Sequence, residues 1–441
     1  MGTKVLKFGG SSLASAQQFR KVAEIIKSQP ERRYVVASAP GKRDSGDTKV
    51  TDMLYNCFRL ASKKEPIDEA FRLVEERYNS IIRELGLDFS LEEEYAKIRM
   101  AISHHAGEDY VASRGEYLNS MILAKYLDFT FVDAENGVFF KEDGTFDDKK
   151  TYAALGALLE KEAYAVVPGF YGSMPNGTIK TFSRGGSDIT GAIVARAVNA
   201  EIYENWTDVS GMLMADPRIV KNPRVIEEIT YRELRELAYM GATVMHEEAV
   251  FPVKEARIPI NIRNTNAPED AGTMIVPSSL SAGPKSVITG VAGRKGFSSI
   301  TIEKSKMNTE VGFCRKVLNV LERLGVSFEH MPSGIDTVSI IVSSAAISDK
   351  KEDIKARIFR DTYADSVTID DGLALIAVVG RGMVRAKGTA GKIFSALGQE
   401  EINIRMIDQG SGEKNIILGV EEADYERTLQ VIYNAFVPED N

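Results

Sequence analysis

Apolar residues follow two different periods along the chain, and their alternation predicts an α/β fold. Residues 5–8 and 34–39 are short apolar runs with the length and composition of buried strands. Between them, residues 19–26 repeat apolar side chains at helical spacing. From residue 54 to about residue 127 this spacing continues with frequent Glu, Lys and Arg, which predicts helices with one solvated face.

The first predicted strand carries Lys7 near its end and runs directly into Gly9, Gly10, Ser11 and Ser12 before a helix begins. Glycines let backbone N–H groups close on an anion without interference from a Cβ atom. The N-terminus of the following helix adds a partial positive charge, and a lysine at the strand end meets a phosphate as a point charge. These residues alone leave two interpretations open, a phosphate-binding turn and an ordinary strand-to-helix turn.

A second stretch, at residues 183–188, repeats this arrangement of strand, paired glycines, hydroxyl residue and helix. Residues 177–182 are predicted to form the second strand of a hairpin, and the helix after the glycines is predicted to extend to residue 199. Arg184 can grip a carboxylate or a phosphate with two parallel hydrogen bonds. Asp188 could be an acid that the helix dipole favours. Two such turns in one chain favour one site for nucleotide phosphates and one for a carboxylate substrate.

Composition narrows the classes of function. The chain has 441 residues, of which 44% are hydrophobic, so it can build two or three globular domains. Its net charge of -8 and its lack of a long basic run argue against nucleic acid as a partner. Cys57 and Cys314 are expected to be reduced packing residues. Because no signal peptide or long apolar run is found, we expect no membrane partner and a cytoplasmic location.

Residues 7–12, Lys-Phe-Gly-Gly-Ser-Ser, closely resemble the K-F-G-G-[ST]-S opening of aspartokinases, within the amino acid kinase superfamily. Residues 183–188 are similar to the same family's [ST]-x-G-R-G-G-S-D segment. The resemblance implies a three-layer α/β sandwich with a mainly parallel sheet over residues 1–283, divided into a substrate lobe and a nucleotide lobe. It also implies ATP-dependent phosphorylation of the side-chain carboxylate of L-aspartate, with Mg²⁺, as the first step of lysine, threonine and methionine biosynthesis.

The resemblance further implies a role for individual residues. The implied catalytic residues are Lys7 and Asp188. The implied substrate-binding residues are Thr51, Glu116, Arg184, Gly185, Gly186 and Ser187. The implied nucleotide-binding residues are Lys7, Phe8, Gly9, Gly10, Ser11, Thr207, Asp208, Asp216 and Arg218. No side chain is assigned as a metal ligand.

Simpler structural interpretations stay open for several of these residues. Thr51 could cap a helix, and Ser113 with Glu116 has the spacing of a capping box at a helix start. The chain also departs from the family pattern, because Leu213 stands where the family has a tyrosine and Thr243 where it has a lysine that contacts nucleotide. What replaces these two contacts is left open.

The C-terminal region, residues 284–441, contains two similar segments. Residues 316–321 resemble residues 392–397, and residues 326–328 resemble residues 402–404, in a βαββαβ pattern. This region resembles paired α+β ACT domains, with one copy inserted in the other and a strand near 287–292 completing the second. The resemblance implies lysine, threonine or both as effector, and a homodimer or dimer of dimers through these domains. The implied effector residues are Met307, Gly312, Phe313, Ser327 and Ser333.

Two other functions compete with an aspartate kinase. The chain could be another amino acid kinase, acting on acetylglutamate, glutamate or a nucleotide. It could also be a non-catalytic amino-acid sensor that uses only its ACT pair, a hypothesis that the departures at Leu213 and Thr243 keep open.

Overall fold

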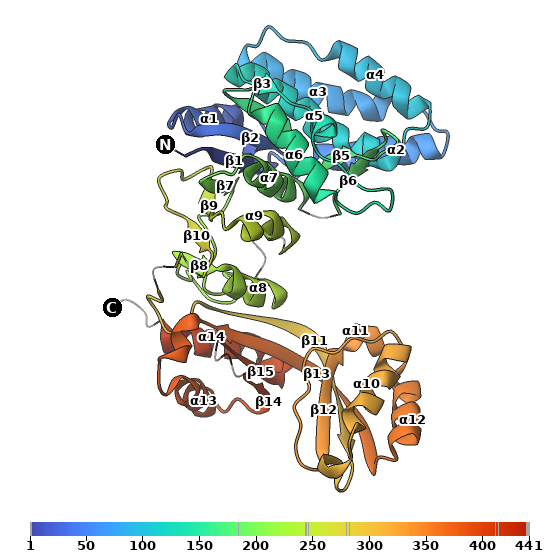
Figure 1. The fold of residues 1–441 in the computed structure, drawn as a ribbon, viewed down its shortest axis with the longest axis vertical. Coiled ribbons are helices and arrows are strands. Elements are labelled where there is room, and N and C mark those ends of the chain that lie inside the picture. Colours follow the sequence, from blue (N-terminus) through green and yellow to red (C-terminus); the bar gives the residue numbers. More distant parts are fainter. Residues whose placement is uncertain are drawn as a thin grey trace. The chain divides into compact units, whose positions relative to one another are not determined.

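The computed structural model describes residues 2–183, 185–242, 245, 247–278, 280–281, 283–410, 412 and 414–437, with the backbone alone at 247 and 248. The chain forms two compact units, coloured by sequence in Figure 1. The first comprises Met1–Met212, Val225–Tyr231 and Val244–Ser281, and the second Leu213–Arg224, Arg232–Thr243 and Ala282–Asn441. A functional division at 283/284 stays a prediction.

The first unit is built on a sheet of eight strands in the order β3-β4-β2-β1-β7-β9-β10-β8. All neighbouring strands are parallel except β9 and β10, which are antiparallel. The strands are β1 (Lys4–Phe8), β2 (Arg32–Ala37), β3 (Thr130–Phe131), β4 (Ala165–Pro168), β7 (Ile202–Thr207), β8 (Glu228–Thr230), β9 (Ile260–Asn264) and β10 (Thr273–Val276). A separate hairpin pairs β5 (Tyr171–Ser173) with β6 (Ile179–Thr181), as predicted.

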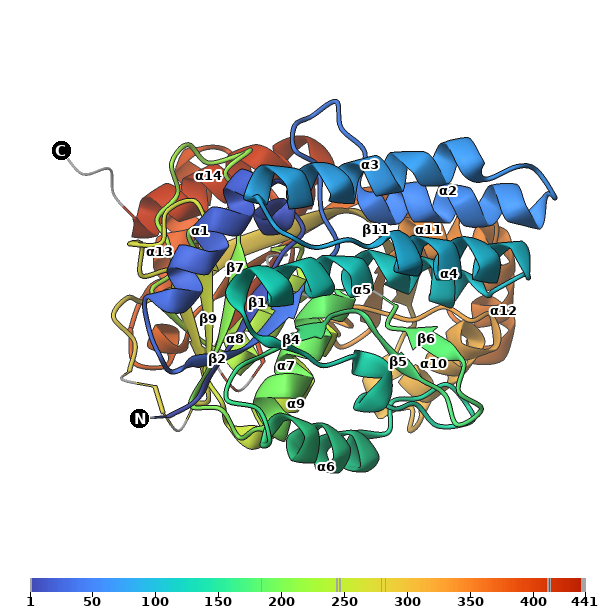
Figure 2. The ribbon, with the colours of Figure 1, turned by 90° about the horizontal axis from the view of Figure 1, so that it is seen from above.

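Helices cover both faces of this sheet, which confirms the three-layer α/β sandwich. Successive side chains of a strand point to opposite faces, and on β1 Leu6 and Phe8 pack into the apolar core that α1 to α5 share. Lys7 points the other way, toward α7. Figures 1 and 2 show α2 to α5 gathered in one helical layer. The helices are α1 (Ala16–Lys27), α2 (Val50–Ser62), α3 (Asp68–Leu85), α4 (Glu92–Ser103), α5 (Glu108–Leu127), α6 (Asp148–Leu159), α7 (Gly186–Ala197) and α9 (Phe251–Ala256).

One more strand of the sheet, which the sequence analysis did not identify, follows β9 in the chain. After β9 the chain turns and returns as β10, antiparallel to β9. The turn needs Gly272, whose φ is +70° and where an added Cβ would lie 1.9 Å from the carbonyl oxygen of Ile262. The apolar run 273–276 is too short for its periodicity to distinguish a strand from a turn.

The second unit contains a sheet of five antiparallel strands in the order β12-β11-β13-β15-β14. The strands are β11 (Gly290–Glu303), β12 (Thr337–Ser343), β13 (Ser366–Val379), β14 (Ile404–Asp408) and β15 (Asn415–Glu421). The helices are α8 (Tyr231–Tyr239, of which Tyr231 belongs to the first unit), α10 (Phe313–Arg323), α11 (Ser344–Ile347), α12 (Lys351–Thr362), α13 (Thr389–Gln399) and α14 (Tyr425–Phe436).

Two long strands, β11 and β13, run through both halves of this sheet. The first part of β11, residues 290–294, pairs with residues 375–379 of β13, on the side where β15 and β14 follow. The second part, residues 297–303, also pairs with β12, and α10 and α12 cover this half. The interleaving expected near 287–292 is therefore made by the first part of β11.

The strand expected at residues 326–328 does not form. Only two isolated bridges, at His330 and Ser333, join the following segment to β12. Pro332 lies between them and has no N–H to donate, so a continuous ladder cannot form there. In the second half, the matching segment 402–404 is in a strand only at its last residue, where β14 begins.

Two segments from earlier in the chain are integrated into the second unit. In the segment 213–224, the carbonyl oxygen of Met214 accepts a hydrogen bond from Val291 N at 2.7 Å. In α8, Glu233 is 1% exposed. Its carboxylate accepts hydrogen bonds from Thr289 Oγ1 at 2.6 Å and from Arg381 Nη1 at 2.7 Å. These bonds tie both segments to β11 and its neighbours.

Candidate active site

The turn after β1 brings Lys7 and Asp188 together. Lys7 is buried, and its Nζ lies 2.7 Å from Asp188 Oδ1 in the first turn of α7. The amide of Gly9 donates to the carbonyl oxygen of Trp206 at 3.0 Å, which fixes the glycine turn against the end of β7. The short 3₁₀ helix η1 (Ser11–Leu13) follows directly, and the amides of Ser12 and Leu13 donate back to the carbonyl oxygens of Gly9 and Gly10.

Asn205 contacts the same carboxylate oxygen of Asp188 as Lys7 does, and the sequence analysis missed it. Its Nδ2 donates to Asp188 Oδ1 at 2.9 Å. Asn205 is the register partner of Lys7 in the parallel pair β1·β7, so both side chains emerge on the face that α7 covers. The amide and the ammonium group together orient the carboxylate.

The N-terminus of α7 depends on its two glycines. Gly185 is the N-cap, with φ of 59° and no side chain capping the helix. At Gly186 an added Cβ would lie 2.5 Å from the ring of Phe170. Because the N-cap residue is a glycine, no N-cap side chain caps the amides at the start of α7. Ser187, in the first turn of this helix, is buried.

The glycine turn of β1 also packs against the turn that follows β2. A Cβ on Gly10 would lie 2.9 Å from the carbonyl oxygen of Ala39, and Gly41 N donates to Gly10 O at 2.8 Å. Arg77 of α3, which the sequence analysis also missed, donates to Gly41 O at 3.1 Å and to Asp47 Oδ1 at 2.5 Å. Its buried guanidinium therefore fixes the loop that leads into α2.

Thr51 lies in the first turn of α2 and does not cap it, so that interpretation is wrong. The N-cap is Lys49, with no side-chain cap bond. Opposite Thr51 lies Gly115 of α5, where an added Cβ would be 3.8 Å from Thr51 Cγ2 and 2.9 Å from Ala39 Cβ. This close packing places the next residue of α5, Glu116, beside the turn.

The capping-box interpretation of Ser113 and Glu116 is also wrong. Both lie inside α5, which begins at Glu108, and Ser113 Oγ donates to the carbonyl oxygen of Tyr110 at 2.7 Å. Five residues of helix precede Ser113, so its hydroxyl bonds within the helix and does not cap a helix start.

Glu116 is the most perturbed acid of the site. Burial raises its pKa from 4.5 to about 8, against the opposing effects of a hydrogen bond from the Ala39 backbone and of the charges on Arg114 and Lys7. Its Oε2 atom is buried and has no hydrogen-bond partner. A buried carboxylate oxygen without a partner is costly, and a cation placed beside it would relieve that cost.

Arg114, another residue that the sequence analysis missed, lies next to Glu116 in an aromatic cage. Its guanidinium carbon lies 4.6, 4.5 and 5.2 Å from the ring centroids of Tyr110, Tyr117 and Tyr171. The only pointer in the sequence was its place inside the Ser-Arg-Gly-Glu segment, where the cage partners could not be known.

The predicted nucleotide residues fall into two groups. Thr207 and Asp208 lie at the end of β7 in the first unit, where Thr207 Oγ1 donates to Asp208 Oδ1 at 3.2 Å. Asp216 and Arg218 belong to the second unit, where they form an ion pair at 2.6 Å, and Arg218 lowers the pKa of Asp216. Their role in nucleotide binding stays a prediction.

Two positions singled out in the sequence, Arg184 and Thr243, lie outside the described residues. Leu213 lies in the second unit. Within the described parts of the chain, no three His, Cys, Asp or Glu side chains are arranged to hold a metal ion. No helix among those residues is both long enough and apolar enough to cross a membrane.

Of the predicted effector residues, Met307, Gly312 and Phe313 lie just before or at the start of α10. Gly312 is its N-cap, with φ of 82° and no side-chain cap bond. Met307 and Phe313 are buried in the apolar core of this half, whereas Ser327 and Ser333 are exposed. Whether this junction binds an effector stays a prediction.

The site is thus formed where the carboxyl ends of β1, β2 and β7 meet the N-termini of α2 and α7 and the middle of α5. It combines Lys7, helix starts without a side-chain cap, and a buried acid with one oxygen that lacks a hydrogen-bond partner. Such a site can hold anions beside the lysine and an ammonium group beside the acid.

Comparisons with known proteins give a consistent result. The model described as the amino acid kinase family matches residues 2–264, and a model of the ACT domain matches residues 376–436. The chain is 40% identical to aspartokinase 3 of Bacillus subtilis over 98% of each chain.

Solved structures agree with these matches. The crystal structure of Clostridium acetobutylicum aspartate kinase is 52% identical, with a TM-score of 0.90 over 99% of this chain and 100% of that chain. Escherichia coli aspartokinase III with aspartate and ADP is 26% identical, with a TM-score of 0.72 over 98% of this chain and 99% of that one. The same enzyme with lysine and aspartate gives a TM-score of 0.71 at 26% identity, with 99% of each chain covered.

Proposed function

The chain belongs to the aspartokinases of the amino acid kinase family, and from this premise we propose how its residues perform the reaction of an aspartate kinase. The enzyme transfers the γ-phosphoryl group of ATP to the side-chain carboxylate of L-aspartate and forms 4-phospho-L-aspartate, which begins lysine, threonine and methionine biosynthesis. The observation that carries the assignment of residues is Glu116, a buried carboxylate with a partnerless oxygen beside the Lys7–Asp188 pair.

The attacking group needs no general base. An aspartate side chain has a reference pKa of about 3.9 and is already ionised at neutral pH. The barrier comes from bringing two anions together, so positioning and charge neutralisation must supply the catalysis. Lys7 contributes the positive charge between them, and Asp188 with Asn205 keeps its ammonium group in place.

Glu116 binds the α-ammonium group of aspartate in this proposal. The incoming cation supplies the partner that Oε2 lacks and keeps the carboxylate ionised. The remaining substrate contacts are proposed for the start of α2 and the start of α7, where uncapped amides favour a carboxylate. These contacts are Thr51, Arg184, Gly185, Gly186 and Ser187.

The nucleotide is proposed to lie against the turn after β1 and the end of β7. The backbone of Gly10 and Ser11 and the side chains of Thr207 and Asp208 lie there. The similar E. coli enzyme is described with ADP, which supports nucleotide use. Mg²⁺ would neutralise the phosphate charge and would be held mainly by phosphate oxygens and water, as its small ion prefers. The contributions of Phe8, Gly9, Gly10, Ser11, Asp216 and Arg218, and a cytoplasmic location, stay predictions.

Regulation is proposed at the start of α10 in the second unit. The E. coli relative described with lysine supports an amino-acid effector of the lysine type. Exposed apolar side chains in the same half, among them Val311 at 99% and Ile335 at 69% exposure, favour self-association there. We expect a homodimer or a dimer of dimers through this surface.

The test is ATP-dependent formation of aspartyl hydroxamate, compared with glutamate and acetylglutamate as acceptors. Of the three acceptors, we expect only aspartate to give product. The Glu116→Gln substitution should raise the KM for aspartate at least about tenfold and should have a smaller effect on the KM for ATP. Acetylglutamate as the preferred acceptor would indicate another amino acid kinase. Amino-acid binding without any phosphoryl transfer would indicate a sensor and refute the proposal.

A further inference from the structure

A second cavity lies on the face of the sheet opposite the Lys7–Asp188 pair. Its volume is about 390 Å³, and its walls come from α1, the starts and ends of three strands, and the turn 265–268. Trp206, at its centre, follows Asn205 on β7, and successive strand side chains point to opposite faces. Because Asn205 contacts Asp188, Trp206 faces away from the active site.

The inner wall of this cavity is rigid. Trp206 is 1% exposed, and its indole lies between the guanidinium groups of Arg32 and Arg263, at 5.3 and 4.8 Å from the ring centroid. Its Nε1 donates to Glu204 Oε2 at 2.9 Å. Glu204 also pairs with Arg32 at 3.0 Å, and both are buried, so this part of the wall is electrically balanced.

The positive charge of Arg263, in contrast, is not neutralised by an ion pair with a described residue. Its Nη2 donates only to backbone carbonyl oxygens, at 2.6 Å to Pro268 and at 3.0 Å to Asp270, and its Nε is buried without a partner. Of the nearby acids, Glu204 is engaged by Arg32, and the Asp270 carboxylate accepts from Ser210 Oγ. Within the described residues, Arg263 forms no ion pair.

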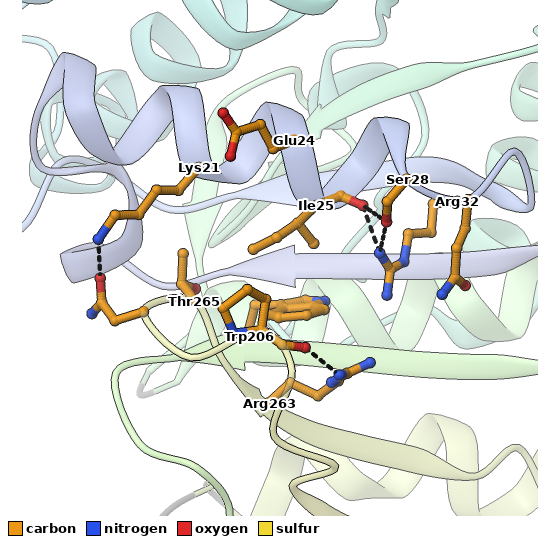
Figure 3. Close-up of a pocket in the computed structure, with 11 residues that line it drawn as sticks. Lys21, Glu24, Ile25, Ser28, Arg32, Trp206, Arg263 and Thr265 are labelled. Atoms are coloured by element: carbon orange, nitrogen blue, oxygen red, sulfur yellow. Dashed lines mark hydrogen bonds between the residues drawn. The ribbon is translucent and has the colours of Figure 1, made fainter.

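Lys21 adds a second cation from the opposite wall. Its Nζ donates to the neutral Oδ1 of Asn266 at 2.9 Å. Figure 3 shows Lys21 and Ile25 on α1, across the cavity from Arg263. The other charged residues of the lining are Arg32, which is paired with Glu204, and Glu24, which is exposed.

We propose that this cavity binds a small organic anion, with a carboxylate or phosphate group held by Arg263 and Lys21 and an apolar body against Ile25, Trp206 and Pro268. Guanidinium groups suit such anions because they offer parallel donors. A volume of about 390 Å³ falls within the range of small-molecule sites. The mixture of an apolar wall with a few polar groups is typical of these sites.

The cavity shares two residues with the support of the active-site turn. The carbonyl oxygen of Trp206 accepts from Gly9 N at 3.0 Å, and Thr265 Oγ1 lies 2.8 Å from Ser12 Oγ. Binding at the cavity does not depend on the proposed function, and it can be measured without turnover.

The chain contains one tryptophan, so indole fluorescence reports on this wall specifically. Benzoate and phenyl phosphate are suitable probes, because they share a ring and differ in the anionic group. We expect a saturable change in Trp206 emission with at least one of them, and calorimetric titration of the same probes measures binding independently of emission. The preferred probe distinguishes a carboxylate from a phosphate ligand.

Variants on both walls test the assignment. Arg263→Lys keeps the positive charge but removes the parallel donors of the guanidinium group, and Lys21→Met removes the positive charge. Each substitution should weaken probe binding at least about tenfold. Lys27→Met, an exposed position on the same helix that does not line the cavity, should leave binding unchanged.

Three results would overturn the proposal. The first is the absence of both heat and emission change with either probe. The second is equal weakening by Lys27→Met and by the two wall variants, which would indicate non-specific attraction. The third is displacement of the probe by a non-hydrolysable ATP analogue with aspartate, which would place the probe in the active site.

Discussion

Replacing Glu116 by Gln should make the stability of the first unit less dependent on pH. Burial raises the pKa of Glu116 from 4.5 to about 8 in the folded enzyme without substrate. Between these values the folded state holds a proton that the unfolded state has released, so stability falls as pH rises through this window and levels off above it. Each pKa unit corresponds to about 1.36 kcal/mol, so full ionisation costs about 5 kcal/mol. Gln removes the titration while keeping the shape.

The measurable quantity is the difference between variant and wild type at two pH values. From about pH 6 to about pH 9 the advantage of Glu116→Gln should grow by about 2.5 kcal/mol. Urea unfolding followed by the emission of Trp206, which lies in the first unit, reports this difference. Glu142→Gln, at an exposed turn, is the matched control and should show no such trend.

Aspartate provides a second arm of the same experiment. Its ammonium group should stabilise wild type more at high pH, because it compensates the ionised Glu116, and should have little effect on Glu116→Gln. For the same reason kcat/KM for aspartate should rise with pH through about 8 in wild type. An advantage of Glu116→Gln that stays constant between the two pH values would refute the reasoning about burial.

Three further variants test other contacts. Lys7→Met should lower kcat about a hundredfold to a thousandfold with a modest change in the KM for aspartate, and near-wild-type turnover in a steady-state assay would exclude Lys7 from catalysis. Asn205→Ala should lower kcat/KM about tenfold or more, because Asp188 loses the bond that orients it; unchanged kinetics would leave Asn205 with a packing role only. Arg381→Met should destabilise the second unit by about 3–5 kcal/mol, since it removes a charged partner of the buried Glu233. Hydrogen exchange of β11 measures this loss, and unaltered protection would contradict it.

Local patterns predicted the parts of the fold that depend on neighbours in sequence. The strand carrying Lys7, the glycine turn after it and the helix opened by Gly185 and Gly186 all follow from short-range periodicity and from backbone freedom at glycine. The parallel three-layer architecture followed from the family resemblance, because periodicity alone does not set strand order.

Contacts between distant segments could not be predicted in this way. The pairing of Asn205 with Asp188 depends on β7 lying beside β1, and no local pattern specifies that neighbour. The capping interpretation of Ser113 failed because α5 begins earlier, at Glu108, where neither residue of the motif is needed. Arg77 reads as one more charged residue on a helix, yet its side chain is buried against the loop before α2.

The segments 213–224 and 232–243 determine where chimeric enzymes can be joined. Both fall within the part of the chain that matches the amino acid kinase model, residues 2–264, yet they group with the second unit. A chimera made with a single crossover near residue 283 would receive the C-terminal part of the second unit without the segments 213–224 and 232–243 that belong to the same unit. We expect exchanges between relatives to keep the enzyme functional only when all three segments of the second unit are transferred together.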